Sequence, residues 1–207
     1  MIYIICRNLS EIKYNVPPSM RIVVNDSPLY LGEIGAWDNI FQDVINNDYK
    51  TVGIYQARRG FHKDLRLCTD NDFDVNDSSI YCTIYELGYD NMLNQFMTCH
   101  PEHASLLERI VTEPYKPLLR TTFIYPHNMF YCTQKTFYRI YGFINSMKTC
   151  PAMLEYVHNK NKIFSLLTER LLTLWILKNN MNVKLCTAFA LNKETGELTN
   201  SYNGISK

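Results

Sequence analysis

The sequence has almost no net charge and no long hydrophobic run. Its formal charge is +1, so it lacks the excess of cations with which proteins bind phosphate backbones, and we expect no nucleic-acid partner. No apolar run approaches the roughly 20 residues that a helix needs to cross a bilayer. The first six residues also lack the length and the basic leader of a signal peptide. These absences predict a soluble, cytoplasmic protein with no membrane span.

The sequence also lacks closely spaced cysteines and several enzyme signatures. Its 7 cysteines are scattered singly, with no pair spaced for zinc or redox chemistry. Cys6, Cys132 and Cys186 lie in apolar runs, where cysteine behaves as a small hydrophobic residue, which is typical of a reducing compartment. There is no phosphate-binding P-loop, no Gly-x-Gly-x-x-Gly, no Gly-x-Ser-x-Gly and no His-Glu-x-x-His. This argues against NTPases, dinucleotide oxidoreductases, serine hydrolases and metalloproteases.

The residues that are present predict one globular α/β domain. Hydrophobic residues make up 46% of the 207 positions and charged residues 20%, a balance typical of folded rather than disordered chains. Short apolar runs predict strands at 2–6, 21–24 and 51–55. Helical spacing of apolar residues predicts a helix at about 32–46. Strand, strand, helix and strand in this order indicate a sheet with crossover connections.

The rest of the chain continues this pattern. Residues 62–79 are polar and irregular, and residues 163–178 form the strongest predicted helix, with an apolar stripe. Further helices are predicted at 89–98, from 100 until Pro114 ends the helix, at 134–147 and at 152–158. Further strands are predicted at 80–85, 121–125, 129–132 and 183–191. We expect the domain to cover residues 1–191. Residues 192–207 are expected to form a polar tail or a linker to a further domain of a longer protein.

The clearest candidate for a ligand-binding segment follows the predicted strand 51–55. It contains Arg58 and Arg59, directly after the strand. Ligands of open α/β sheets bind just past the carboxyl ends of strands. Adjacent guanidinium groups there can bind a diphosphate, because each presents a planar fork of donors. A solvated basic turn explains the doublet equally well, and the residues alone favour neither interpretation.

An acidic cluster lies further along the chain. It contains two overlapping Asp-x-Asp patterns, which share Asp72 and include Asp70 and Asp74. Paired carboxylates can hold Mg²⁺ or Mn²⁺, and such an ion can neutralise a leaving diphosphate. On the pattern alone, a solvated acidic loop is the favoured interpretation.

Three other positions have a functional and a structural interpretation. Glu33 lies in the first turn of a predicted helix, where the helix dipole is a sufficient reason for a carboxylate, or it accepts hydrogen bonds from a donor sugar or base. His127 and Asn128 interrupt a strand pair, either as a turn or as a contact to a metal or sugar. Glu169 or Arg170 points toward the ligand edge of the sheet, or the two form a surface ion pair.

Four stretches, at 32–39, 52–61, 126–130 and 164–175, carry a resemblance to a known family. The chain resembles small glycosyltransferase-like domains of capsular polysaccharide synthesis proteins. Its most specific matches are the Arg58–Arg59 doublet followed by Phe61, and the run from Glu169 to Leu172. The chain also looks like the N-terminal domains of chlorovirus glycosyltransferases that decorate the capsid protein.

The resemblance implies a GT-A-like fold, an α/β structure with a mixed, mostly parallel sheet flanked by helices. It implies a UDP- or GDP-sugar donor at the strand ends, bound with Mn²⁺ or Mg²⁺, and a glycan or glycoprotein acceptor. Under this reading Glu169 is the carboxylate near the reacting carbon. The other implied roles are diphosphate binding by Arg58 and Arg59, metal binding by Asp72 and Asp74, and donor contacts by Arg7, Glu33, His127 and Asn128.

The sequence departs from the family at the key strand. Gln56 and Ala57 stand where the family usually has His-Tyr, and the usual Asp-x-Asp after this strand is absent. Either the later acidic cluster supplies the metal ligands, or the arginines take over much of the charge of the metal. Two other classes stay open, namely a different nucleotide-dependent transferase such as a methyltransferase, and a non-catalytic carbohydrate-binding domain of the same fold.

Overall fold

A mixed sheet organises the chain, which is described here from a computed structural model covering residues 1–63, 66–156, 162–191 and 198–200. Its main body has the strand order β2 (Met20–Val24), β1 (Ile2–Cys6), β3 (Thr51–Gln56), β9 (Phe130–Thr133), β6 (Ser79–Cys82) and β10 (Asn182–Leu185). Within this order only β9 runs against the others, so the sheet is mostly parallel, as predicted.

A smaller extension continues the sheet beyond β3. β4 (Arg59–Lys63) folds back from the end of β3 and pairs with β5 (Arg66–Leu67) and β11 (Ala188–Leu191). β12 (Leu198–Asn200) pairs with β11. A separate two-stranded ladder joins β7 (Tyr85–Glu86) to β8 (Phe123–Ile124).

Both faces of the central strands are buried, which explains why their sequences are continuously apolar. Tyr3 and Ile5 belong to a large core under the helices α1 (Trp37–Asn47) and α4 (Gln134–Lys148), where Trp37 meets Phe130 edge-on at 5.6 Å. The alternate residues Ile2 and Ile4 belong to a second core on the other face. Successive strand residues point to opposite faces, so one apolar run serves both cores.

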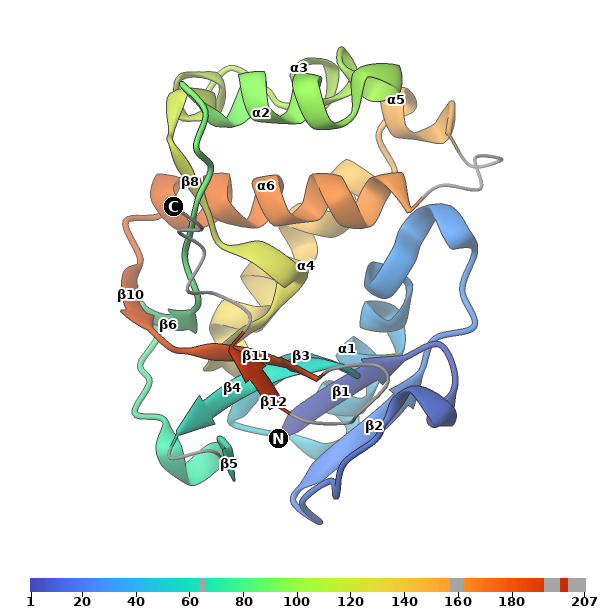
Figure 1. Ribbon diagram of the computed structural model, residues 1–207, viewed down its shortest axis with the longest axis vertical. Coiled ribbons are helices and arrows are strands. Elements are labelled where there is room, and N and C mark those ends of the chain that lie inside the picture. Colours follow the sequence, from blue (N-terminus) through green and yellow to red (C-terminus); the bar gives the residue numbers. More distant parts are fainter. Residues whose placement is uncertain (64–65, 157–161, 192–197, 201–207) are drawn as a thin grey trace.

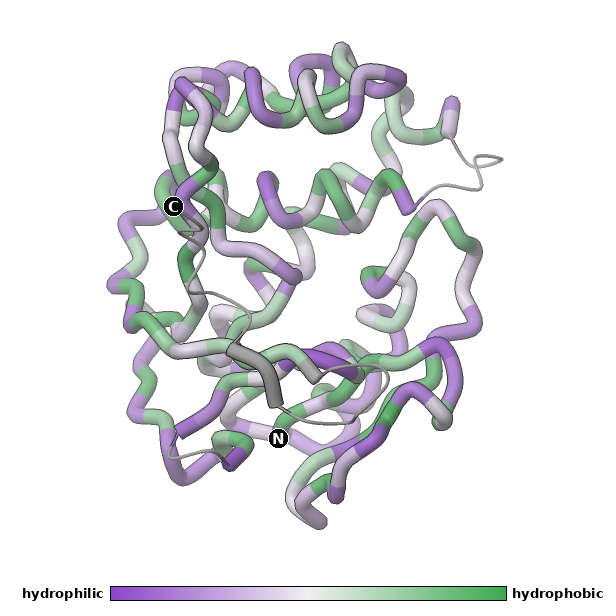
Figure 2. Tube along the Cα trace, in the orientation of Figure 1, coloured by the Kyte–Doolittle hydropathy of each residue, from purple (hydrophilic) through white to green (hydrophobic). Residues whose placement is uncertain are grey.

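The helix α6 (Ile163–Lys178) is buried almost all round, with 12 of its 16 residues buried. It packs on α4 and is covered by an outer layer of α2 (Met92–Cys99), α3 (Leu106–Ile110) and α5 (Pro151–Leu154) (Figure 1). Figure 2 shows α6 largely in the hydrophobic colour, whereas the outer helices alternate. The predicted single apolar stripe was therefore too narrow, because a second layer covers its other face.

Short 3-10 helices form most of the remaining turns. They are η1 (Leu9–Glu11), η2 (Leu29–Ala36), η3 (Asp70–Asp72), η4 (Pro101–His103), η5 (Lys116–Arg120) and η6 (Pro126–Asn128). Within the described ranges, no helix combines the length and the apolar character that a bilayer crossing requires.

Three sequence predictions need correction. The helix expected at 32–46 begins only at Trp37, because Gly32 has φ 57° and breaks the preceding turn. Residues 62–79 are not irregular throughout, since β5 and η3 lie there. The strand expected at 183–191 is two strands, β10 and β11, and β12 follows it. The domain boundary at residue 191 stays a prediction.

Candidate functional site

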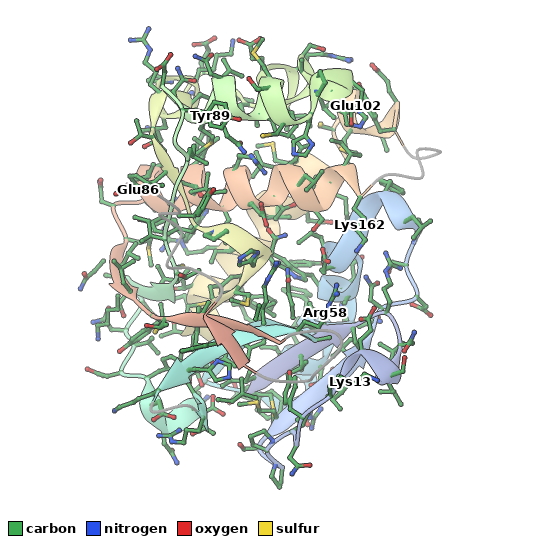
Figure 3. All side chains as sticks on the ribbon, in the orientation of Figure 1. Lys13, Arg58, Glu86, Tyr89, Glu102 and Lys162 are labelled. Carbon is green, nitrogen blue, oxygen red and sulfur yellow. The ribbon has the colours of Figure 1, made fainter. Side chains whose placement is uncertain are left out.

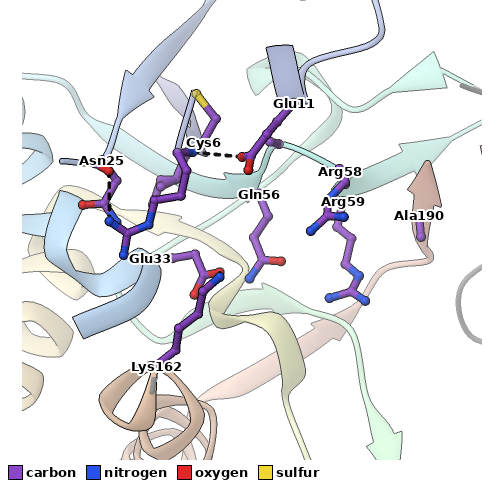
Figure 4. Close-up of a pocket in the computed structure, with 12 residues that line it drawn as sticks. Cys6, Glu11, Asn25, Glu33, Gln56, Arg58, Arg59, Lys162 and Ala190 are labelled. Atoms are coloured by element: carbon purple, nitrogen blue, oxygen red, sulfur yellow. Dashed lines mark hydrogen bonds and ion pairs between the residues drawn. The ribbon is translucent and has the colours of Figure 1, made fainter. Parts of the chain in front are cut away.

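A cleft of about 310 Å³ opens at the carboxyl ends of β1 and β3. We call it the strand-end cleft. Its polar lining comes from the loops after β1 and β2, the turn between β3 and β4, η2, and the residue that precedes α6 (Figure 4). The polar residues that line it are Arg7, Glu11, Asn25, Glu33, Gln56, Arg58, Arg59 and Lys162. The sequence predictions for Arg7, Glu33, Arg58 and Arg59 thus converge on one place.

Arg7 lines the cleft but uses its guanidinium to hold the chain around it. Its Nη1 donates to the carbonyl of Asn25 at 3.2 Å and to that of Ser27 at 2.8 Å, and its Nη2 to that of Gly32 at 3.4 Å. Glu11 accepts from the Arg7 backbone N–H at 2.9 Å. These bonds satisfy carbonyl groups of the segment that leads into η2, so Arg7 shapes one wall of the cleft.

Glu33, in η2, provides an ionised carboxylate on the same wall, across the cleft from Arg58 and Arg59 (Figure 4). One carboxylate oxygen accepts from the Ser165 hydroxyl, and the other lies 3.6 Å from Lys162 Nζ. Burial alone would raise the pKa of Glu33, but the bonds from Ser165 and its own backbone, with the charge of Lys162, lower the pKa overall. At neutral pH Glu33 therefore accepts hydrogen bonds and does not donate them.

The two arginines of the doublet have different surroundings. Arg58 is exposed, and within the described part of the chain its guanidinium makes no hydrogen bond or ion pair. Figure 3 shows Arg58 and Lys162 on the same side of the molecule, one from the sheet layer and one from the start of α6. Arg59 is partly buried, and its Nη1 lies 2.9 Å from His127 Nδ1.

His127 and Asn128 do not line the cleft but lie behind it in η6, where both are buried. Burial, with the adjacent charge of Arg59, lowers the pKa of His127 to about 3. Its ring is therefore neutral at neutral pH. Asn128 donates from Nδ2 to the Ser165 carbonyl at 3.1 Å and to its hydroxyl at 3.2 Å. The predicted direct contacts of these two residues with a donor stay predictions.

Glu169 is also absent from the cleft lining, with 18% of its side chain exposed. Its Oε1 accepts from the His127 backbone N–H at 2.7 Å, and its Oε2 lies 3.3 Å from Arg170 Nη1. Burial raises the pKa of Glu169, against the opposing charge of Arg170. The ion pair of Glu169 and Arg170 is thus buried, not on the surface. The catalytic role of Glu169 stays a prediction.

The structure does not bring Asp72 or Asp74 to the cleft. Asp72 forms a two-pronged ion pair with Arg66 at 2.5 and 2.7 Å, and its carboxylate also accepts from the Thr69 backbone N–H at 2.8 Å. The Arg66 guanidinium holds the pKa of Asp72 far below its usual range. Asp74 is fully exposed beside Lys184. Each aspartate therefore has a sufficient structural explanation.

The position of this acidic segment explains why it misses the cleft. Asp70 accepts from Tyr131 at 2.8 Å and from the N-terminal amine at 2.9 Å, next to Thr51 at the amino end of β3. Gln56, at the other end of β3, is about 17 Å away for a strand of this length. The described residues contain no group of three or more His, Cys, Asp or Glu placed to hold a metal. Asp72 and Asp74 thus do not fit as ligands of Mn²⁺ or Mg²⁺ at the cleft.

The sequence did not identify Glu11, Asn25 or Lys162 as cleft residues. Glu11 and Asn25 lie in turns after β1 and β2, and turn residues carry no periodic signal. Both strands run parallel to β3, so the turns that follow the three strands lie at the same edge of the sheet. Applying this rule to the predicted strands could have identified Glu11 and Asn25. Lys162 reaches the cleft only because α6 starts against η2, a long-range contact.

Comparison with known proteins supports the class of this fold. No protein-family model matches the sequence, and no curated protein matches it. Among solved structures, the apo structure of WbbM, a bifunctional glycosyltransferase, superimposes with a TM-score of 0.65 at 14% sequence identity. The match covers 90% of this chain and 44% of the WbbM chain, so the chain spans less than half of that protein.

The strand order and the WbbM match together define a glycosyltransferase-like α/β fold. At this identity the likeness concerns the fold, and the substrates of WbbM are not transferred with it. The match thus supports the predicted glycosyltransferase fold, whereas the resemblance to capsular polysaccharide synthesis proteins stays a prediction. A chlorovirus relationship and a cytoplasmic location stay predictions from the sequence.

Proposed function

We propose that this chain is a glycosyltransferase domain that takes a sugar from a nucleotide-sugar donor and passes it to a glycan or glycoprotein acceptor. One observation carries the proposal: the strand-end cleft combines an arginine doublet, of which Arg58 is exposed and Arg59 partly buried, with an ionised carboxylate, in a fold shared with a glycosyltransferase. Open α/β sheets bind ligands at this edge.

The diphosphate of the donor binds at the turn between β3 and β4. Arg58 is exposed there without a protein partner in the described residues, so its five N–H donors remain available to phosphate oxygens. Arg59 lies next to it with its guanidinium already held by one bond. Two guanidinium groups also offset the charge that develops on the leaving nucleoside diphosphate when the sugar is transferred.

The hydroxyl groups of the donor bind on the opposite wall. A carboxylate is a strong acceptor for sugar or ribose O–H groups. Glu33 is such an acceptor, because its pKa is lowered and it stays ionised. Lys162, 50% exposed at the start of α6, supports the same wall and can reach a phosphate oxygen from the other side.

The proposal is tested by titrating the chain with a panel of UDP- and GDP-sugars, with and without Mn²⁺, and with S-adenosylmethionine. We expect a UDP- or GDP-sugar to raise the melting temperature, because a ligand that binds only the native state stabilises it. Release of the nucleoside diphosphate, faster with an acceptor glycan, would establish transfer. Stabilisation by S-adenosylmethionine alone would refute the proposal. Binding of sugars without turnover would indicate a carbohydrate-binding domain.

A further inference from the structure

The turn η6 lies directly behind the strand-end cleft in an unfavourable backbone conformation. His127 has φ 70° and Asn128 has φ 54°, both in the left-handed region. Non-glycine residues rarely adopt this region, and two in succession persist only when surrounding contacts hold them. Such conformations cluster at functional sites.

Side chains from two elements hold this turn. Gln56, at the end of β3, donates to the His127 carbonyl, and Glu169 of α6 accepts from the His127 backbone N–H at 2.7 Å. Ser165 of α6 accepts both bonds from Asn128. The carboxylate of Glu169 is mostly buried, so this bond lies in a region with little competing water.

The contact between His127 and Arg59 has a fixed direction. A guanidinium carries only donors, so His127 Nδ1 accepts the bond from Arg59 Nη1 at 2.9 Å. The ring proton of the neutral imidazole then resides on Nε2. Because the backbone of His127 is held by α6 and β3, the acceptor atom has a defined position from which it orients Arg59.

We propose that His127 is a positioning residue that orients the Arg59 guanidinium toward the strand-end cleft, and that Glu169 acts through it by holding the turn. This rests on the proposed function, in which Arg59 binds the donor diphosphate. In this role His127 acts through Arg59 and needs no contact of its own with the donor. Without the acceptor on His127, the Arg59 side chain samples other rotamers. Binding of the donor must then order this long side chain, which in the wild type is already ordered before the donor binds.

A matched pair of variants tests the proposal. Asparagine and glycine both tolerate a left-handed backbone, but only asparagine offers an acceptor near the position of Nδ1. We expect His127→Gly to weaken binding of UDP or GDP by up to about tenfold, the usual effect of having to order one long side chain on binding. We expect His127→Asn to restore most of the affinity. Equal losses in both variants, or no loss in either, would overturn the proposal.

A double mutant shows whether His127 acts through Arg59. If it does, Arg59→Ala combined with His127→Gly should lose no more affinity than Arg59→Ala alone. The reason is that the effects of two mutations do not add when one residue acts only through the other. Fully additive losses would mean that His127 acts independently, and would overturn the proposal. Glu169→Gln, which keeps an acceptor oxygen, should retain more affinity than Glu169→Ala, and the reverse order would exclude Glu169 from this role.

Imidazole ¹⁵N spectra of the ligand-free protein separate this inference from the proposed function. We expect His127 to be neutral with Nδ1 unprotonated, assigned by loss of its signals in His127→Asn. A proton on Nδ1 would overturn the inference whatever the protein binds. If the spectra show the expected tautomer but no UDP- or GDP-containing ligand binds the wild type, the proposed function fails and the diphosphate role of Arg59 fails with it.

Discussion

Arg59 Nη1 lies 2.9 Å from His127 Nδ1, which joins the only basic doublet after β3 to a buried histidine 68 residues further along the chain. Arginine cannot accept this bond, so the neutral form of His127 is part of the native structure. Protonation of the ring would place two positive groups in contact. The pair therefore links the charge state of a buried residue to the shape of the cleft.

The first prediction concerns stability at mildly acidic pH. The pKa of His127 falls from its usual 6.5 to about 3 in the native state. Between these values the unfolded chain binds a proton that the native chain does not, so stability falls as the pH decreases. The loss is about 1.4 kcal/mol per pH unit, or about 2 kcal/mol between pH 7 and pH 5.

Thermal unfolding at several pH values measures this effect. Lowered pKa values of His62 and His100 act in the same direction, and the raised pKa of Glu169 acts in the opposite one. The test therefore compares the wild type with His127→Asn. Below pH 6.5 the variant should lose less of its free energy of unfolding than the wild type does. Identical pH profiles of the two proteins would show that His127 does not titrate as its burial predicts.

The second prediction concerns Arg58. Arg58→Ala should weaken binding of a nucleotide sugar by about 1.5–3 kcal/mol, the usual effect of losing a hydrogen bond to a charged group. The melting temperature should stay unchanged, because Arg58 is exposed and bonds to no described residue. Arg120→Ala is the matched control, since it removes the same charge from an exposed position outside the cleft. Equal affinity in both variants would remove Arg58 from the site.

The third prediction separates stability from metal binding in the acidic segment. Asp72→Asn should destabilise the fold by about 1 kcal/mol, because it weakens the pair with Arg66 and the cap at Thr69. Asp74→Asn should have almost no effect, since Asp74 is fully exposed. Neither variant should change a response to Mn²⁺, measured as donor binding before and after EDTA. A response that disappears in both variants would restore these residues as metal ligands.

The strands and the main helices could be predicted because their signals are local. β1 and α6 coincide with the predicted ranges, since an apolar run and a 3.6-residue period are visible without knowledge of the fold. The prediction of a ligand edge at Arg58 and Arg59 rests on a general rule of α/β sheets, and the cleft lies there.

The remaining features depend on contacts between distant segments. Asp72 looks like a metal ligand in the sequence, but its partner Arg66 lies on β5, which the polar pattern did not reveal. Glu33 and Ser165 are 132 residues apart, and only the packing of η2 on α6 joins them. The turn at His127 was recognised, but its left-handed backbone and burial follow from α6, not from local residues.

The last prediction concerns that packing of η2 on α6, which builds one wall of the cleft. Gly32 has φ 57°, and a Cβ added there would lie 2.4 Å from Ser165 Cβ. Ser165 cannot move freely, because its hydroxyl bonds Glu33 and it accepts from Asn128. Gly32→Ala should therefore combine the strain of a backbone conformation that suits glycine, φ 57° and ψ −139°, with a collision, and cost more than the roughly 1 kcal/mol of a residue in the left-handed helical region.

Two other glycines separate these contributions. Gly88 has φ 65° but no atom within 4 Å of an added Cβ, so Gly88→Ala should show the backbone strain alone. Gly142, inside α4, also has open space and no positive φ, so Gly142→Ala should stabilise the protein by roughly 0.5–1 kcal/mol. Denaturant unfolding of the three variants should rank Gly32→Ala as the least stable and Gly142→Ala as the most stable. If Gly32→Ala were no worse than Gly88→Ala, η2 would have room to move away from α6, and the wall that carries Glu33 would be adjustable rather than fixed.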